Sequence, residues 1–431
     1  MTSARPLRRR LAATLTLVLV PAAAAGAKPT PAPKLKPCAP SWVASSYAAP
    51  VQTVPGISNR TYRSILTSHY PGQLLRVRVT NALGKVPVHV DDVSAALVVT
   101  NAELQPDSVR AVTFGGRPGI TLAAGEDAWS DPVALTVTGM QKVAVSFYAH
   151  GYTGPLTAHS AEPQDSNGPP TDLIPIGLSM DAHTSFISTA GDHTRDVAGN
   201  QFVQPDTTSA LVDGLSVRTT TRTRGVVALG DSITDGFESS PNADASWPDD
   251  LARRFLQARM RVSVVNAGIS GGQVRRGQGR GPSAVERFDR DVLSQPGVST
   301  VILLEGINDI GSNASAASII AVYRQLIARA HAHHIAIYGG LLTPAGEALR
   351  PFPGPESFPQ GQATRHAVND WIATSHAFDG VIDFDGAVAN PRFPEQWKVG
   401  YSLDDLHGND AGYRLMAGAV PLAPLAAPHC R

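Results

Sequence analysis

The chain has 431 residues, which is enough for one or two domains with a buried core. Its formal net charge is zero, so nucleic acid and anionic membranes are excluded as main partners, because proteins that bind them carry a basic surface. Only 17% of the residues are charged, while 39 glycines and 34 prolines exceed the usual share. This composition favours a loop-rich, β-containing secreted protein.

The N-terminus has the three parts of a secretory signal peptide. Four arginines among the first ten residues precede an apolar run, Leu11 to Val20, and small residues ending at Ala27 follow. Because the run is too short to span a bilayer, we expect residues 1–27 to be cleaved near Ala27 and the mature chain to be secreted, without stable membrane association. Residues 28–41, rich in proline and lysine, are interpreted as an extended leader.

The two cysteines, Cys38 and Cys430, lie at opposite ends of the mature chain. In an oxidising compartment we expect a disulfide between them, since the termini of a folded chain often lie close together. Two free or intermolecular thiols are the alternative. Two cysteines cannot form a zinc site alone.

Residues 42–221 show the pattern of β-strands. Strands are predicted at the alternating run from Leu75 to Thr80, from Val86 to Val90, from Val133 to Val137 and from Val143 to Tyr148. Clusters of proline, glycine and aspartate separate them, and no stretch has a sustained helical period. We therefore predict an antiparallel β-sandwich domain over residues 42–221.

Residues 222–431 alternate between short apolar runs and helical segments. The expected strands are Val226–Leu229, Val262–Val265, Val301–Leu304, Ile335–Tyr338 and Val381–Phe384, and the expected helices are Pro248–Arg259, Ser283–Leu293, Ser315–Ala332, Ala363–Thr374 and Asp410–Ala417. This order predicts an α/β domain with a parallel sheet and helices on both faces.

Four short segments of this second domain carry reactive or polar groups. In the first, an apolar run leads into Gly230-Asp231-Ser232-Ile233, where a tight turn exposes one serine. The others, in chain order, are Asn266 to Gly271, Gly306 to Asp309 and Asp404 to His407. A serine hydroxyl is a weak nucleophile unless a base takes its proton and donors stabilise the oxyanion. The four segments supply both kinds of group.

Together the segments resemble the signature blocks of the SGNH hydrolases, also called the GDSL esterases, with Ile233 where that family has leucine. The resemblance covers the C-terminal half and implies a flavodoxin-like, three-layer α/β fold. It also implies Ser232 as nucleophile, His407 as base and Asp404 as the residue that orients the histidine. Asp404 and His407 are three residues apart, so both side chains can face one way across a single turn.

For the oxyanion hole, the resemblance implies the backbone N–H groups of Ser232 and Gly271 and the side chain of Asn308. Gly268 is a competing glycine, but the family donor ends the Asn-x-x-x-x-Gly stretch. Asp231 is interpreted as a support for the serine turn. No metal or other cofactor is expected, because a serine–histidine pair makes its own nucleophile.

Two alternative assignments come from the same segments. Asp405 could replace Asp404, although it is expected to point elsewhere. Ser270 could be the nucleophile, because residues 268–272 fit the pattern G-x-S-x-G. That pattern requires a helix directly after the serine, and the glycine- and arginine-rich stretch from 271 to 282 does not favour one.

Some other side chains have both a functional and a structural interpretation. Clustered histidines can bind metal, arginines can line a substrate entrance and tryptophans can stack on sugar rings, but helix ends, solvated loops and core packing explain them as well. These residues are His331, His333 and His334, then Arg275, Arg276 and Arg280, and finally Trp247 and Trp397.

The implied chemistry is ester hydrolysis. The order of signal peptide, β domain and hydrolase domain is similar to that in the xylan-esterase-like branch of the family. The β domain of that branch contains a sequence motif like the one from Val77 to Gly84. This resemblance implies removal of O-acetyl groups from a polysaccharide or another acylated sugar. We also expect the protein to be a monomer. A lipase or general short-chain acyl esterase is the alternative. A catalytically silent carbohydrate-binding protein is the alternative from another class, since fold alone does not prove activity.

Overall fold

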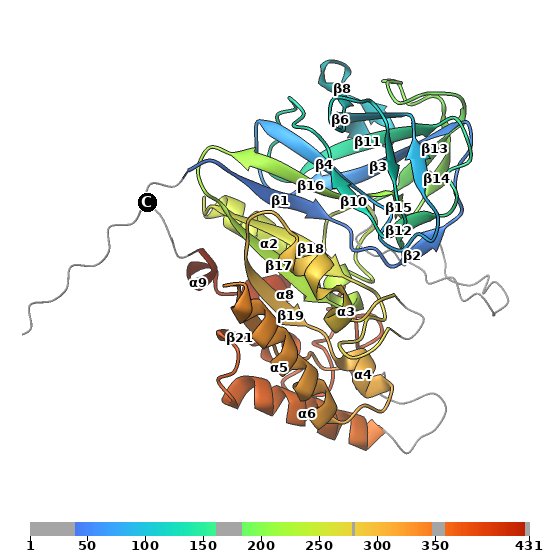
Figure 1. Cartoon of the computed structure of the whole chain (residues 1–431). Coiled ribbons are helices and arrows are strands. Elements are labelled where there is room, and N and C mark those ends of the chain that lie inside the picture. The colour runs from blue at the N-terminus through green and yellow to red at the C-terminus, as the bar shows by residue number, and fades with distance from the viewer. Residues whose placement is uncertain (1–38, 161–182, 278–280, 347–357, 427–431) are drawn as a thin grey trace, which may run out of the picture.

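The computed structural model describes residues 39–160, 183–277, 281–346 and 358–426. Figure 1 shows one region built of strands and a second in which helices surround a sheet. The predicted signal peptide, most of the predicted leader and both cysteines, Cys38 and Cys430, lie outside the described residues. Among the residues that are described, no helix is both long and apolar enough to cross a bilayer.

The N-terminal region consists of antiparallel strands. In chain order they are β1 (Ser41–Tyr47), β2 (Gln52–Val54), β3 (Arg60–Ser68), β4 (Leu74–Thr80), β5 (Val88–Val90), β6 (Asp92–Thr100), β7 (Glu103–Leu104), β8 (Arg110–Val112), β9 (Ile120–Leu122), β10 (Asp127–Trp129), β11 (Gln141–Ala149), β12 (Leu156–Ser160), β13 (Ser185–Ala190), β14 (Phe202–Asp206), β15 (Thr208–Ala210) and β16 (Val212–Thr219). One sheet has the order β1-β16-β4-β10, the largest follows β14-β13-β3-β11-β6-β7, and a third is β15-β12-β2. The prediction of an antiparallel β region is thus confirmed.

A hydrophobic core joins these sheets. Alternation along β4 buries Leu75, Val77 and Val79, and the same core cluster contains Val143 and Val145 of β11. The period of two from Leu75 to Thr80 therefore marks the face of β4 that packs into this core, and Arg78 and Thr80 on the other face are also buried. Layering of the sheets as a β-sandwich stays a prediction.

The predicted strand from Val133 to Val137 is wrong. Only isolated bridges form there, between Val133 and Leu75 and between Val137 and Gly72. The N–H of Leu135 donates to the carbonyl of Val133 at 2.8 Å, and this local turn interrupts the ladder. The apolar pattern arose because the side chains of Val133, Leu135 and Val137 are all buried.

The C-terminal region contains a parallel sheet of five strands, which confirms the predicted sheet. The strands are β17 (Arg224–Gly230), β18 (Val262–Gly268), β19 (Val298–Leu304), β20 (Ala336–Gly340) and β21 (Gly380–Ile382). Their spatial order is β18-β17-β19-β20-β21, and all pairs are parallel. This 2-1-3-4-5 order is the flavodoxin-like one, in which the chain changes direction across the sheet at its first strand.

The helices of this region form two groups. They are α1 (Ser232–Asp235), α2 (Trp247–Gln257), α3 (Ala284–Phe288), α4 (Ile307–Gly311), α5 (Ala316–Ala332), α6 (Phe358–Thr374), α7 (Phe384–Val388), α8 (Asp410–Ala419) and α9 (Leu422–Ala426). Helix α8 packs on α2 and α7, whereas α5 packs on α3 and α6. Right-handed crossovers place these two groups on opposite faces of the sheet.

Several element boundaries differ from the prediction, and two of the differences have a clear local form. The expected helix from Ser283 to Leu293 is divided into α3 and a π-helical turn over Asp289–Leu293. The expected strand from Val381 to Phe384 ends at Ile382, because Asp383 caps α7 and its side chain accepts the N–H of Gly386.

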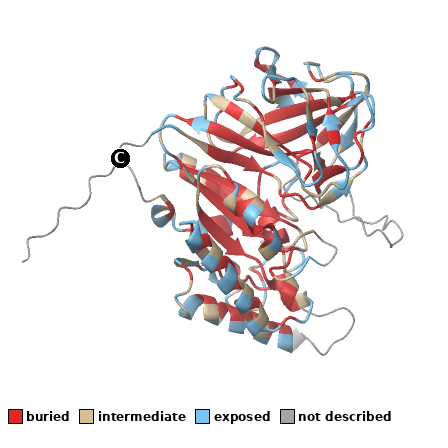
Figure 2. Cartoon of the chain, viewed as in Figure 1, coloured by how far each residue is buried: buried red, intermediate tan, exposed pale blue. Residues whose placement is uncertain are grey.

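The two regions share a buried interface. The Ser263 hydroxyl of β18 donates to the carbonyl of Ala44 in β1 at 2.6 Å, and Tyr47 Oη donates to Asp291 Oδ1 at 2.5 Å. Ala44 and Tyr47 belong to the same core cluster as the strands of the parallel sheet. Figure 2 shows the buried residues running along the central strands of both regions. The predicted boundary at residue 221 falls between β16 and β17.

Candidate active site

Three of the four singled-out segments follow neighbouring strands of the parallel sheet. Ser232 comes directly after β17, Gly271 follows β18 and Asn308 follows β19. Since β17 lies between β18 and β19, the carboxyl ends of these strands meet where the chain changes direction, which is where open α/β sheets bind their ligands. The fourth segment, with His407, lies just before α8.

The serine stands at the start of a short helix. Ser232 is the first residue of α1, and Asp231 caps it by accepting the Ile233 N–H on its side chain at 3.0 Å. First-turn N–H groups have no partner inside a helix. A Cβ on Gly230 would lie 2.4 Å from the carbonyl oxygen of Leu304, so this close approach of β17 to β19 requires glycine.

A line of hydrogen bonds joins Ser232, His407 and Asp404. Ser232 Oγ lies 2.8 Å from His407 Nε2, and His407 Nδ1 lies 2.6 Å from Asp404 Oδ2. Asp404 Oδ1 also accepts the backbone N–H of His407 at 2.7 Å. Burial by itself would raise the pKa of Asp404, but the hydrogen bonds and electrostatic attraction of His407 lower it from its ordinary value. The ionised carboxylate therefore holds the proton on Nδ1 and leaves Nε2 to accept from the serine.

The three residues expected to stabilise an oxyanion follow the neighbouring strands β17, β18 and β19. Gly271 has a positive φ of 72°, and among the described residues neither its N–H nor that of Ser232 donates to a protein acceptor. Asn308 Nδ2 donates to the carbonyl of Gly272 at 2.9 Å, which fixes the amide and leaves its second hydrogen. Gly268 serves another purpose, because a Cβ there would lie 2.2 Å from the backbone nitrogen of Asp235.

The alternative residues lie outside this line. Ser270 Oγ donates to Asp235 Oδ2 at 2.9 Å, and the described residues that follow it, 271 to 277, form no helix. Asp405 Oδ1 accepts the backbone N–H of Trp397 at 2.7 Å. Each therefore has a structural role of its own.

The remaining residues of interest are distributed over the surface and the core. His331 is exposed and pairs with Asp379 at 2.9 Å, and His333 and His334 are also exposed. Trp247 and Trp397 are buried in the core. Arg275 is half-buried and Arg276 exposed, while Arg280 lies outside the described residues.

Two residues beside His407 were not predicted. The Phe237 ring lies 4.5 Å from the His407 ring, and Glu238, with a positive φ of 68°, follows it. Within the described ranges, Glu238, Asp404 and His407 form the one group whose ligand atoms are close enough to hold a metal ion, at 4.8 Å or less. Both nitrogens of His407 are already hydrogen-bonded, so this group does not form an independent metal site. Burial, and then the charge of Asp404, raise the pKa of Glu238.

The sequence reasoning also missed a buried arginine under the site. Arg287 donates to the carbonyls of Ala267 at 2.6 Å and Gly230 at 2.8 Å, which holds the ends of β18 and β17 together. It also pairs with Asp291 at 2.9 Å and Glu305 at 3.3 Å. Burial raises the pKa of Glu305 to about 7, although Arg287 opposes the shift. No local pattern distinguishes Arg287 from a surface arginine, so only the fold reveals it.

Comparison with known proteins supports one family. Residues 228–415 match the model of the GDSL-like Lipase/Acylhydrolase family. A search among curated proteins found no match.

Solved structures similar to the chain include three proteins of low identity. They are a lipolytic G-D-S-L family member from Veillonella parvula (22% identity, TM-score 0.33, 46% of this chain and 96% of that chain), a lipase/acylhydrolase from Enterococcus faecalis (21%, 0.36, 46% and 93%) and a GDSL-like lipase from Bacteroides thetaiotaomicron (19%, 0.35, 46% and 85%).

Proposed function

We propose that the protein is a serine esterase. The proposal starts from the match of residues 228–415 to the GDSL-like lipase/acylhydrolase family. That family indicates hydrolysis of esters. The observation that carries the proposal is the hydrogen-bonded line from Ser232 through His407 to Asp404, with distances of 2.8 and 2.6 Å. The same three residue types form the Ser-His-Asp triad of unrelated hydrolases.

The proposed reaction has two halves. Ser232 Oγ attacks the ester carbonyl while His407 Nε2 takes the hydroxyl proton, and Asp404 stabilises the imidazolium that forms. His407 then gives this proton to the departing alcohol, which leaves an acyl-serine. Water, deprotonated by His407, hydrolyses the acyl-serine and releases the acid.

The oxyanion of each tetrahedral intermediate needs fixed donors. The N–H groups of Ser232 and Gly271 and the side-chain amide of Asn308 are the proposed set. Gly272, whose carbonyl binds Asn308 at 2.9 Å, holds this amide in place before substrate arrives. Preorganised donors of this kind act on charge that develops in the transition state.

The proposed substrate is an O-acetylated polysaccharide or another acylated sugar. This part rests on the resemblance to the xylan-esterase-like branch. One observation favours the alternative, a lipase or general acyl esterase: Phe393, Val399 and Leu403, near the loop of Asp404 and His407, are all exposed, by 61%, 89% and 74%. Exposed apolar side chains this close in sequence to the catalytic residues suit an apolar acyl chain.

Assays with a panel of substrates distinguish a sugar O-acetyl esterase from a lipase or general acyl esterase. The purified protein would be assayed for acetate release from acetylated xylan and acetylated sugars, and for turnover of p-nitrophenyl esters of increasing acyl length. We expect the highest kcat/KM with acetyl groups on sugars. A kcat/KM that rises steadily with acyl length would replace the sugar esterase by the lipase reading.

The Ser232→Ala variant is the blank for every assay. Loss of the triad serine costs several orders of magnitude in rate, and a small hydroxyl contributes little to stability. If the wild-type chain turned over no ester at all, the silent carbohydrate-binding protein would become the better account. Prolonged chelation should leave turnover unchanged, because the proposed nucleophile needs no metal.

Secretion and a Cys38–Cys430 disulfide complete the proposal. Both follow from the sequence of the N-terminus and the position of the two cysteines. Peptide mapping of protein secreted by its native host, without reduction, should find a chain that begins near Lys28 and a cross-linked Cys38–Cys430 peptide. Two free thiols in that protein would contradict the disulfide and leave the esterase proposal intact.

A further inference from the structure

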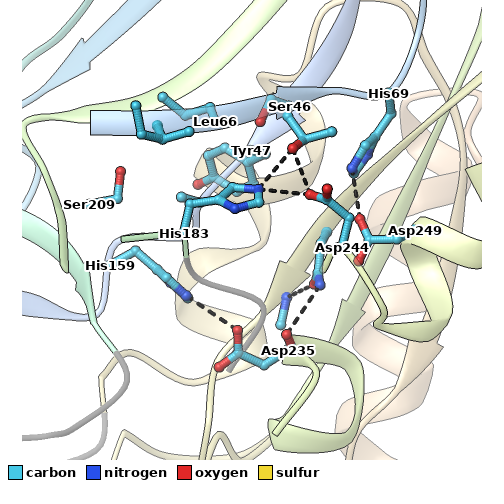
Figure 3. A pocket seen from close by; sticks show the side chains of 15 residues that line it. Ser46, Tyr47, Leu66, His69, His159, His183, Ser209, Asp235, Asp244 and Asp249 are labelled. Atoms are coloured by element: carbon cyan, nitrogen blue, oxygen red, sulfur yellow. Dashed lines mark hydrogen bonds and ion pairs between the residues drawn. The ribbon is translucent and has the colours of Figure 1, made fainter. Parts of the chain in front are cut away.

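A pocket at the interface of the two regions contains three buried ion pairs of one kind. In each, a histidine of the N-terminal region faces an aspartate of the C-terminal region, as Figure 3 shows. The pairs are His69–Asp249 at 2.8 Å, His159–Asp235 at 3.2 Å and His183–Asp244 at 2.7 Å. One of these pairs continues into the candidate active site.

His159, on β12, has an oxygen atom beside each of its ring nitrogens. Its Nδ1 lies 2.8 Å from the carbonyl oxygen of Ala49, and its Nε2 lies 3.2 Å from Asp235 Oδ1. The Ala49 carbonyl can only accept, so Nδ1 carries a proton, and a protonated ring would also donate from Nε2 to the Asp235 carboxylate. Burial lowers the pKa of His159, but the charge and hydrogen bond of Asp235 outweigh burial and raise it above 6.5.

Asp235 also contacts the loop that contains Ser270 and Gly271. Its second oxygen, Oδ2, accepts the backbone N–H of Ser270 at 3.1 Å and the Ser270 hydroxyl at 2.9 Å. Ser270 directly precedes Gly271, whose N–H belongs to the proposed oxyanion hole. Asp235 is also the last residue of α1, the helix that begins at Ser232.

We propose that His159 is a positioning residue for the esterase reaction: through Asp235 and Ser270 it holds the Gly271 amide where the oxyanion forms. The inference rests on the proposed function. It makes the N-terminal β region a part of the catalytic machinery rather than an appended module. Donors of an oxyanion hole work because they are held in place beforehand, and a misplacement of about 1 Å costs roughly 100-fold in rate.

The chain offers a matched control at His69. Its Nδ1 lies 2.8 Å from the carbonyl of Val264 and its Nε2 lies 2.8 Å from Asp249 Oδ1, so it too lies buried between a carbonyl and a carboxyl group across the interface. Asp249 Oδ2, however, accepts from Ser246, the cap of α2. A role limited to stability predicts the same effect at both histidines, whereas positioning predicts an effect on rate at His159 alone.

The test compares three variants in steady-state hydrolysis of p-nitrophenyl acetate. In His159→Asn, the amide replaces Nδ1 and loses Asp235, so kcat should fall roughly 10- to 100-fold with little change in KM. In His159→Gln, the amide reaches the place of Nε2 and should restore kcat to within about threefold of wild type. His69→Asn should keep kcat within about threefold while lowering Tm as much as His159→Asn does.

The outcomes are distinct. Equal kcat losses in His69→Asn and His159→Asn, or a folded His159→Asn with wild-type kcat, would overturn the positioning role and leave the esterase standing. Absence of turnover in the wild type would overturn both the positioning role and the proposed esterase function.

A second variant serves if His159→Asn fails to fold. Ser270→Ala removes one hydrogen-bond donor to Asp235 and keeps the ion pair of Asp235 with His159. This variant should lower kcat by about 3- to 10-fold, and an unchanged kcat would refute the inference.

Discussion

Asn308 is the residue through which the oxyanion proposal can be tested most simply. Its amide is held by the carbonyl of Gly272 at 2.9 Å and it lies at the start of α4. We expect Asn308→Ala to lower kcat by roughly 100- to 1000-fold, the cost of one lost donor. KM should change less, because the donor acts on charge that develops in the transition state.

Steady-state kinetics with p-nitrophenyl acetate check this prediction. Ser312→Ala is a suitable control. The Ser312 hydroxyl accepts a hydrogen bond from Gln273 Nε2 at 2.8 Å, and Ser312 is not one of the proposed oxyanion donors. A variant Asn308→Ala with normal kcat and raised KM would make the residue a substrate-binding group instead.

At this scale, residues that react were easier to predict than residues that support them. Ser232, Asn308, Asp404 and His407 stand in motifs whose chemistry is readable without a structure. His159 and Asp235 are far apart in the chain, and their pairing depends on how the two regions meet. No spacing in the sequence carries that information.

At the scale of elements, Arg287 holds two strand ends. It lies in α3, is fully buried, and donates to the last residue of β17, Gly230, and to Ala267 of β18. Replacing it by methionine would leave the carboxylates of Asp291 and Glu305 without this cation. We expect Arg287→Met to lower the free energy of unfolding by about 3–5 kcal/mol, as for other broken buried pairs.

Denaturant unfolding of Arg287→Met would be compared with that of Arg195→Met. Arg195 is 62% exposed and pairs with Asp92 at 3.5 Å, so its loss should change the free energy of unfolding by no more than about 1 kcal/mol. Similar values for both variants would show that Arg287 does not stabilise the strand ends.

Element types were predictable where an apolar period was long and undisturbed. The parallel strands and α2, α5 and α8 follow from such runs. The segment from Val133 to Val137 has an apolar pattern but a local turn at Leu135, and the helix expected from Ser283 to Leu293 changes to a π-helical turn at Asp289. In both cases tertiary contacts determine the backbone conformation, and local sequence propensity does not predict such contacts.

At the scale of the whole molecule, the interface should make stability depend on pH. Burial lowers the pKa values of His69 and His159, but their aspartates raise both above 6.5. Because the folded state holds these protons more tightly than the unfolded state, their contribution is complete below pH 6.5. It is lost as the pH rises through the raised pKa values.

Unfolding curves measured from pH 6 to 9 would test this. The free energy of unfolding of the wild type should fall with rising pH, and its advantage over a His69→Asn/His159→Asn double variant should shrink over the same range. A constant difference between the two proteins across that range would contradict protonated histidines at the interface.

The order of the two regions along the chain was predictable from composition and period, but the residues through which they associate were not. Ala44 and Tyr47, in a strand assigned to the β region, complete the core of the parallel sheet. The sequence pattern does not show that these side chains pack against the parallel sheet.

Covalent labelling tests the central claim, that Ser232 is the nucleophile of an esterase, most directly. The protein would be treated with a serine-directed organophosphate, and the modified peptide identified by mass spectrometry while hydrolysis of p-nitrophenyl acetate is followed. We predict one label per chain, on Ser232, with activity lost in proportion and with no labelling in a folded His407→Ala variant. A label on Ser270, or full activity in protein that is completely labelled at Ser232, would contradict the account.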